Sequence, residues 1–386
     1  MRSFAERTGL TSDRPKTRYL WTDAFAVCNF LELAHRTGER AYTELALQLV
    51  DQVHHVLGRY RADDTRTGWI SGLDEREGES HPTRGGLRIG KTLPERRPRE
   101  PLDQRLEWDR DGQYFHYLTK WMHALDQVSA VTDDLRFNLW ARELGEVAYT
   151  AFTREGRAGR RMVWKMSTDL SRPLVASMGQ HDPLDGLITC AQLETTTALW
   201  PRSVPGPDLQ RAAADFATMV DGLDLRTEDP LGLGGLLSDA YRVAQLMARG
   251  AFHDGILLGR LLGAAQAGLV HYSQHGDWQQ PASRRLAFRE FGLAVGLAAL
   301  ERLQKDTDEG RCAPVSDELR ARVNALVSHV GLRAAIVSSW LDPEHQGVRT
   351  WSEHRDINEV MLVTSLAPDG FLVLPVRSDR SGSRSY

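Results

Sequence analysis

Apolar residues recur every three to four positions along most of the 386-residue chain, and this spacing is the feature that most limits its fold. Such a stripe covers one face of an α-helix, whereas the alternating pattern of a half-buried strand is rare and short here. Short links join the stripes in pairs, as in the 36–39 turn with its Gly38 stop signal. The sequence therefore predicts an all-α fold built from antiparallel helical hairpins.

Five or six such hairpins are expected, at irregular intervals along the chain. The expected helix pairs cover residues 21–35 and 39–60, 111–130 and 133–153, 183–200 and 207–223, 236–249 and 252–272, 283–304 and 316–330, and 331–340 and 354–366. Between the second and third pairs, residues 161–178 have a strand-like composition around a polar turn, which predicts a small β-hairpin insertion.

Charge, cysteine usage and hydropathy exclude several classes of protein. The 48 Lys and Arg residues are scattered and are outnumbered by 52 Asp and Glu, which disfavours a nucleic-acid partner. Cys28, Cys190 and Cys312 lack CxxC spacing, so we expect neither a zinc cluster nor a disulfide framework, and no metal or other cofactor. Without a signal-peptide core or a run of about 18 apolar residues, we expect no membrane partner and a cytoplasmic location.

Acidic and aromatic residues gather where the first helix of each expected pair begins. These starts read WTDAF from Trp21, WDRDG from Trp108, HDPLDG from His181, SDAYR from Ser238, FREFG from Phe288 and HRDIN from His354. Any one acid can be explained as a helix cap or as a partner of the helix dipole. Their recurrence favours convergence of these helix ends on one site.

Paired helices of this number, with short turns within pairs, long loops between some pairs and acidic-aromatic helix starts, resemble the (α/α)6 toroid of the six-hairpin glycosidases and the N-acylglucosamine 2-epimerase relatives. The resemblance covers about residues 18–375 and rests on architecture. Residues 1–17 are then an N-terminal extension, residues 18–375 the toroid domain, and residues 376–386 a disordered tail.

The resemblance implies six inner helices around a cavity, substrate-binding residues at one mouth, and a sugar or oligosaccharide as the substrate. We therefore expect a carbohydrate-active enzyme, first of all a glycoside hydrolase that uses paired carboxylates in the central cavity. Two alternatives remain open. One is a sugar epimerase or isomerase with histidine acid–base chemistry, and the other is a non-catalytic toroid that binds a carbohydrate or a protein.

The stretch EWDRDGQYFHYLTKW, residues 107–121, holds more acids than a helix cap requires. Glu107, Asp109 and Asp111 are therefore the first candidates for the two carboxyl groups that glycoside hydrolysis needs. Crowded acids, or an acid held against the indole of Trp108, would have a raised pKa, as a general acid at neutral pH requires.

If Asp111 caps the following helix, Gln113, His116 and Lys120 share one side of that helix. On an isolated surface helix this polar side would face solvent. On the inner helix of a toroid it would face the central cavity, because an inner helix has no face toward bulk solvent.

Further catalytic candidates lie at two other helix starts. Asp182 could supply a partner carboxylate, although Pro183 fits a first helical turn and makes Asp182 an equally reasonable N-cap. His354 and Asp356 could form an acid–base pair, and capping at a solvent-exposed helix start explains them equally well. Because Trp and Tyr present flat apolar faces with polar edges to sugar rings, the substrate-binding candidates are the residues near these starts: Trp21, Asp23, Trp108, Tyr114, His181, Asp185 and Trp351.

Overall fold

The structure is a computed structural model that describes residues 1–374 except 157–158, 201–204, 254, 276 and 313–315. It is predominantly helical, with small antiparallel sheets of two and three strands, so the expected mostly-α fold with a small β insertion is confirmed. Residues 376–386, for which the sequence predicts a disordered tail, lie outside the described residues.

The long helices follow one another in packed pairs, as the hydrophobic periodicity predicts, with ends shifted by several residues. α2 (Leu20–Thr37) packs on α3 (Arg40–Leu57), α6 (Phe115–Thr132) on α7 (Leu135–Phe152), α8 (Asp182–Ala198) on α9 (Gln210–Asp221), α10 (Pro230–Ala248) on α11 (Ile256–His275), and α12 (Ala287–Asp308) on both α13 (Asp317–Val327) and α14 (Gly331–Leu341). Gly38 ends α2 in the left-handed conformation, as its stop signal indicates.

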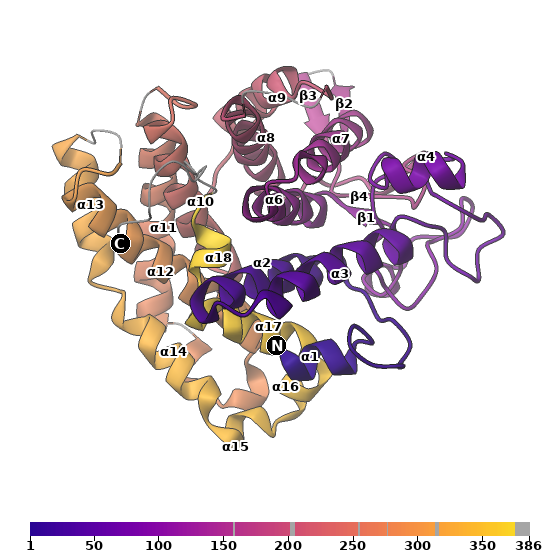
Figure 1. The fold of residues 1–386 in the computed structure, drawn as a ribbon. Coiled ribbons are helices and arrows are strands. Elements are labelled where there is room, and N and C mark those ends of the chain that lie inside the picture. The colour runs from indigo at the N-terminus through magenta and orange to yellow at the C-terminus, as the bar shows by residue number, and fades with distance from the viewer. Residues whose placement is uncertain (157–158, 201–204, 254, 276, 313–315, 375–386) are drawn as a thin grey trace.

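Five first helices of these pairs and one further helix, α17, which the sequence analysis placed second in the sixth pair, contact one another in a closed cycle. α2 contacts α6, α6 contacts α8, α8 contacts α10, α10 contacts α12, α12 contacts α17 (Arg355–Leu366), and α17 returns to α2. Figure 1 shows the second helices α3, α7 and α9 farther than their partners from the short helix α18 (Asp369–Leu372), which contacts α2 and α10. The cycle lets each of its six helices turn one face inward.

The remaining elements are short. They are α1 (Arg2–Arg7), α4 (Glu75–Ser80), α5 (Gln104–Glu107), α15 (Pro343–Gln346), α16 (Arg349–Glu353) and two 3-10 turns, Asp277–Gln279 and Ala282–Arg284. β2 (Thr153–Gly156) and β3 (Gly159–Met162) form a hairpin, and β4 (Lys165–Met166) pairs antiparallel with both β1 (Gln113–Tyr114) and β5 (Pro173–Val175). No helix within the described residues has the length and apolar content needed to span a membrane.

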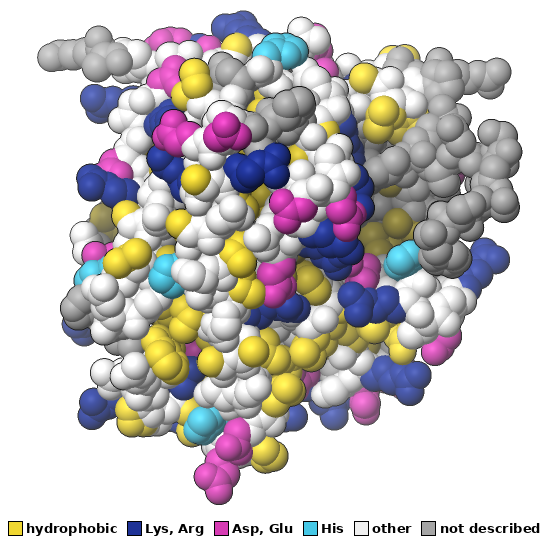
Figure 2. Space-filling view, turned by 90° about the vertical axis from the view of Figure 1, so that its left-hand side faces the viewer, with side chains coloured by type: hydrophobic (Ala, Val, Ile, Leu, Met, Phe, Trp, Pro, Cys, Tyr) yellow, Lys and Arg dark blue, Asp and Glu magenta, His cyan; other side chains and the backbone are white. Residues whose placement is uncertain are grey.

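The outer face that carries α13 and α14 has a mixed surface. Figure 2 shows basic, acidic and apolar side chains interspersed over it, without a single basic stripe. This distribution follows the scattered placement of Lys and Arg in the sequence.

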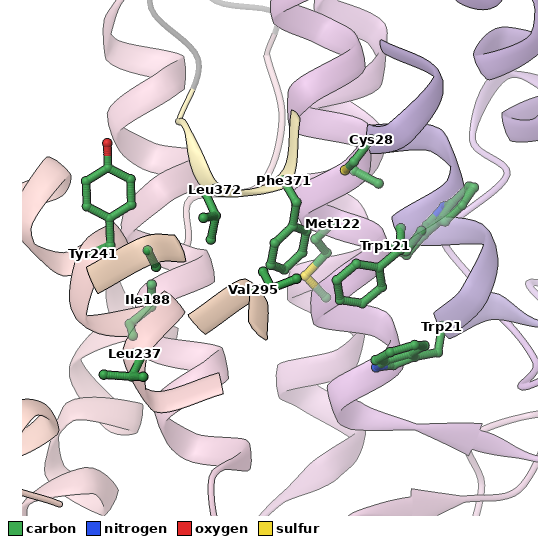
Figure 3. Close-up of a cluster of buried hydrophobic side chains, with 14 of the residues drawn as sticks. Trp21, Cys28, Trp121, Met122, Ile188, Leu237, Tyr241, Val295, Phe371 and Leu372 are labelled. Atoms are coloured by element: carbon green, nitrogen blue, oxygen red, sulfur yellow. The ribbon is translucent and has the colours of Figure 1, made fainter. Parts of the chain in front are cut away.

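α18 closes one end of the cycle with an apolar plug. The ring of Phe371 stacks on Phe25 at a centroid distance of 4.4 Å, and its backbone carbonyl lies 2.9 Å from His123 Nε2. Figure 3 shows Phe371 and Leu372 among buried apolar side chains of the neighbouring helices. Gln245 of α10 donates from its side-chain amide to the carbonyl of Leu372 at 2.9 Å. His123 and Gln245 lie in the middle and the last turn of their helices, so these contacts of α18 are away from the starts of α6 and α10.

α10 and α12 cross at glycines. A Cβ on Gly234 would lie 2.0 Å from the carbonyl oxygen of Gly292, and a Cβ on Gly296 would lie 2.5 Å from Gly234 Cα. Only residues without a side chain allow two helix backbones to approach this closely.

We expect Gly234→Ala to lower the free energy of unfolding by about 1–3 kcal/mol, since the new methyl group forces α10 and α12 apart. Gly235→Ala is the matched control, because nothing lies within 4 Å of its Cβ position. Urea unfolding followed by circular dichroism measures both variants. Equal stability of the two would contradict the close crossing.

Candidate functional site

The three acids of the 107–111 stretch differ in burial and in their partners. Asp109 is exposed, and the neighbouring Trp108 keeps 57% of its surface in solvent. Glu107 and Asp111 are buried and paired with cations. The structure therefore does not gather the three carboxylates at one point.

Asp111 stabilises the long loop between α3 and α6 through three contacts. Its carboxylate pairs with the Arg88 guanidinium and accepts the backbone N–H of Gly90 at 3.0 Å and of Lys91 at 3.3 Å. Asp111 does not cap α6, which begins at Phe115, so that expectation of the sequence analysis is corrected. The physical reason is that the two residues before Phe115 pair with β4 and delay the helix.

Glu107 has a similar supporting role. It pairs with Arg96 at 3.0 Å and with Lys165 at 2.9 Å, and Lys165 is fully buried. The ammonium group of Lys165 also donates to the carbonyls of Glu107 at 2.6 Å and Arg110 at 2.9 Å. These bonds hold the turn after α5 against β4.

A second polar cluster lies inside the cycle of helices, and it draws on three of them. Lys120 of α6 pairs with Asp185 of α8 at 2.7 Å. His116, one turn earlier on α6, has its Nδ1 3.7 Å from Asp182 Oδ1. The polar side of α6 that the sequence placed on one face thus meets the acidic start of α8.

α10 contributes the third part of this interior cluster. Asp239 pairs with Arg242 at 3.1 Å, and Arg242 also donates to the side-chain carbonyl of Gln192 on α8 at 2.6 Å. Both ionic groups of the Asp239–Arg242 pair are at most 8% exposed. We define the interior cluster as His116, Lys120, Asp182, Asp185, Asp239 and Arg242.

Burial controls the protonation of the interior cluster. It raises the pKa of Asp182 to about 8; the charge of Asp185 adds to the shift, while the Gly179 backbone hydrogen bond and Lys120 oppose it. One oxygen of Asp182, Oδ2, is buried with no hydrogen-bond partner among the described residues. Burial also raises the pKa of Asp239, again with a contribution from Asp185. Asp182 is therefore a protonated acid at neutral pH.

His116 is the matching proton acceptor. Its imidazole keeps 30% of its surface exposed, yet desolvation lowers its pKa to about 4. At neutral pH the ring is uncharged and can accept a proton. The cluster thus places an imidazole with a lowered pKa 3.7 Å from a carboxyl group with a raised pKa.

Two tyrosines join the starts of α2 and α6. The hydroxyl groups of Tyr19 and Tyr117 lie 2.6 Å apart, joining the residue before α2 to α6. Burial raises the pKa of Tyr117, and the positive charge of Arg289 on α12 acts against that shift. The starts of α2 and α6 are therefore joined by this pair of hydroxyl groups.

The predicted residues of α2 are buried around its first turn. Trp21 packs on Phe25 with ring centroids 4.4 Å apart. Asp23 accepts the Tyr19 backbone N–H at 2.9 Å and lies 3.6 Å from Arg18. Burial raises the pKa of Asp23 to about 6. Asp23 thus bonds to the backbone at the start of α2.

The predicted residues near α17 make contacts with other elements. Asp356 accepts a hydrogen bond from Arg7 of α1 at 2.7 Å, and the ring of His354 lies 5.6 Å from Phe288. Trp351 stacks on Trp340 at 5.7 Å. Within the described part of the chain, these contacts do not reach the α8 acids. His181, by contrast, lies beside them as the N-cap residue of α8.

A cavity of about 770 Å³ lies away from the interior cluster, between α11 and the start of α13. Its charged lining is paired, since Arg322 bonds to Glu318 at 3.2 Å and Arg226 to Asp224 at 2.6 Å. It lacks the donor and acceptor pair of the interior cluster, so size alone does not make it the better site.

Comparisons with known proteins assign the chain to no family. No protein-family model matches the sequence, and no curated protein matches it. Among the described residues, no group of three His, Cys, Asp or Glu side chains is placed to hold a metal ion.

Proposed function

We propose that this protein is a carbohydrate-active enzyme of the (α/α)6 toroid class, a glycoside hydrolase whose site is the interior cluster. The single observation that carries the proposal is the position of two acids one turn apart at the start of α8: Asp182, whose pKa burial raises to about 8, and Asp185, which is paired with Lys120. The closed cycle of six helices supports the toroid assignment.

Glycoside hydrolysis needs one protonated and one ionised carboxyl group on the two sides of the scissile bond. Asp182 would donate its proton to the leaving oxygen, and its raised pKa keeps that proton available at neutral pH. Asp185, held by Lys120 at 2.7 Å, carries the negative charge that activates water or stabilises the developing positive charge on the sugar. Burial strengthens both effects by removing competing water.

One further observation favours a second candidate, a sugar epimerase. The neutral ring of His116 lies 3.7 Å from Asp182 Oδ1, so a proton could be removed by one residue and supplied by the other. In an epimerase the proton is exchanged at a carbon of the sugar and not at a glycosidic oxygen.

Product analysis on a panel of glycosides and free sugars tests the proposal. Hydrolysis releases a new reducing end, whereas epimerisation interconverts isomers without changing the number of molecules. Release of reducing ends supports the hydrolase. Isomer formation alone would replace it with the epimerase, and sugar binding without turnover would leave a binding toroid.

The rate should fall tenfold per pH unit above about pH 8, because the donor Asp182 must be protonated and its raised pKa is about 8. In Asp185→Asn the neighbouring negative charge is gone, so the alkaline limb of the residual activity should move to lower pH. A pH profile of kcat/KM for both proteins measures this. If the alkaline limb of the profile does not move, the ionisation that it reports does not belong to Asp182.

A further inference from the structure

A small cavity of about 210 Å³ opens beside the start of α6, with Trp108, Tyr114 and Trp164 in its wall. Drug-sized ligands occupy roughly 300–1,000 Å³, so this space suits a single ring-sized group. Two of its three aromatic residues, Trp108 and Tyr114, were substrate-binding candidates from the sequence. The third, Trp164, precedes β4 and had no sequence signal.

The aromatic rings of this pocket are rigidly placed. Trp164 stacks on Tyr114 at 5.0 Å with an angle of 8° between the rings, and Trp108 meets Trp164 edge-on at 5.0 Å. The Trp164 backbone is fixed at both ends, because its N–H donates to Ser177 at 3.1 Å and its carbonyl accepts from Phe115 at 3.2 Å. Trp108 and Trp164 therefore form two fixed walls at an angle.

Two features of these walls are unexplained by packing. Trp108 keeps 57% of its surface exposed, whereas an indole that serves only to pack the core is mostly buried. The indole nitrogen of Trp164 is buried and has no hydrogen-bond partner among the described residues, although buried donors are normally paired. A ligand with a flat apolar face and hydroxyl groups would use both features.

Stacked rings link the pocket to the interior cluster. The rings of Trp164 and His116 are nearly parallel, with centroids 6.4 Å apart, and His116 in turn lies 3.7 Å from Asp182. A group in the pocket would therefore be separated from Asp182 by the Trp164 and His116 rings, without occupying the position of the proton donor.

We infer that this aromatic pocket binds a second sugar ring, so that the substrate is an oligosaccharide and not a free monosaccharide. The inference rests on the proposed function, because the bond to be cleaved must lie between this ring and the one at Asp182. The Trp164 N–H donates to a sugar hydroxyl, and the face of Trp108 stacks on the ring.

Calorimetric titration of Asp182→Asn with monosaccharides and with the matching di- and trisaccharides tests the pocket, since this variant should bind sugars without turning them over. Disaccharides should bind about 3- to 10-fold more tightly than monosaccharides, as one stacking contact provides. Adding Trp108→Ala should abolish that gain, and Trp164→Phe, which keeps the stack but removes the N–H, should reduce it. Trp278→Ala is the control, because Trp278 lines a different cavity.

The outcomes separate the two proposals. If monosaccharides bind and wild-type protein turns over glycosides, but disaccharides gain no affinity or keep their gain in Trp108→Ala, the pocket inference is overturned and the enzyme stands. If no sugar binds or is turned over, the proposed function falls and the pocket inference falls with it.

Discussion

Asp182→Asn should lose on the order of 10²- to 10⁴-fold in turnover of the glycoside that the wild-type protein cleaves. The amide matches the carboxylic acid in shape but cannot donate a proton to the leaving oxygen. Because burial raises the pKa of Asp182 to about 8, the native group is already uncharged at pH 7, and the change removes no ion pair. Stability should therefore stay close to that of the wild type.

Steady-state kinetics and thermal unfolding, measured together, separate chemistry from folding. Asp51→Asn is the matched control. The Asp51 side chain on α3 is 68% exposed, and it pairs with His55, which is outside the interior cluster. If Asp182→Asn keeps its activity, the proton donor is another residue. If the control also loses activity, the loss in Asp182→Asn does not identify Asp182 as the donor.

Asp111→Ala should have the opposite profile, a large loss of stability with a much smaller effect on turnover. The Asp111 side chain is 0% exposed and its partner Arg88 only 7%, so the substitution leaves a buried guanidinium without its counter-charge. Breaking a buried pair in this way costs about 3–5 kcal/mol. The backbone N–H groups of Gly90 and Lys91 also lose their acceptor.

Thermal unfolding measures this loss, and kcat/KM per folded molecule measures the effect on chemistry. Asp63→Ala is the matched control, because the Asp63–Arg61 pair is half-exposed and worth at most about 1 kcal/mol. An Asp111→Ala protein with wild-type stability and no turnover would return the catalytic role to the 107–111 stretch.

The helices could be predicted because their signals are local. The Gly38 stop and the apolar stripe of α2 depend on neighbours within one turn, and the structure has both. The start of α6 could not be placed, because the preceding residues pair with β4, which lies some fifty residues further along. Contacts of that range leave no periodic trace in the sequence.

The site was predictable in part for the same reason. Asp182 and Asp185 stand out at a helix start, and the shared side of His116 and Lys120 follows from helical spacing. The Asp239–Arg242 pair lies in the middle of α10, where a charged residue in a sequence gives no sign of burial. The excess of acids at 107–111 has a structural explanation for Glu107 and Asp111, namely buried ion pairs with cations far away in the chain.

A crystal structure of Asp182→Asn with its tightest-binding oligosaccharide tests the central claim most directly. We expect one sugar ring inside the cycle of helices, with its glycosidic oxygen within hydrogen-bond distance of residue 182 and its ring facing His116 and Asp185. Sugar bound only outside the cycle, for example in the cavity between α11 and α13, would contradict the account.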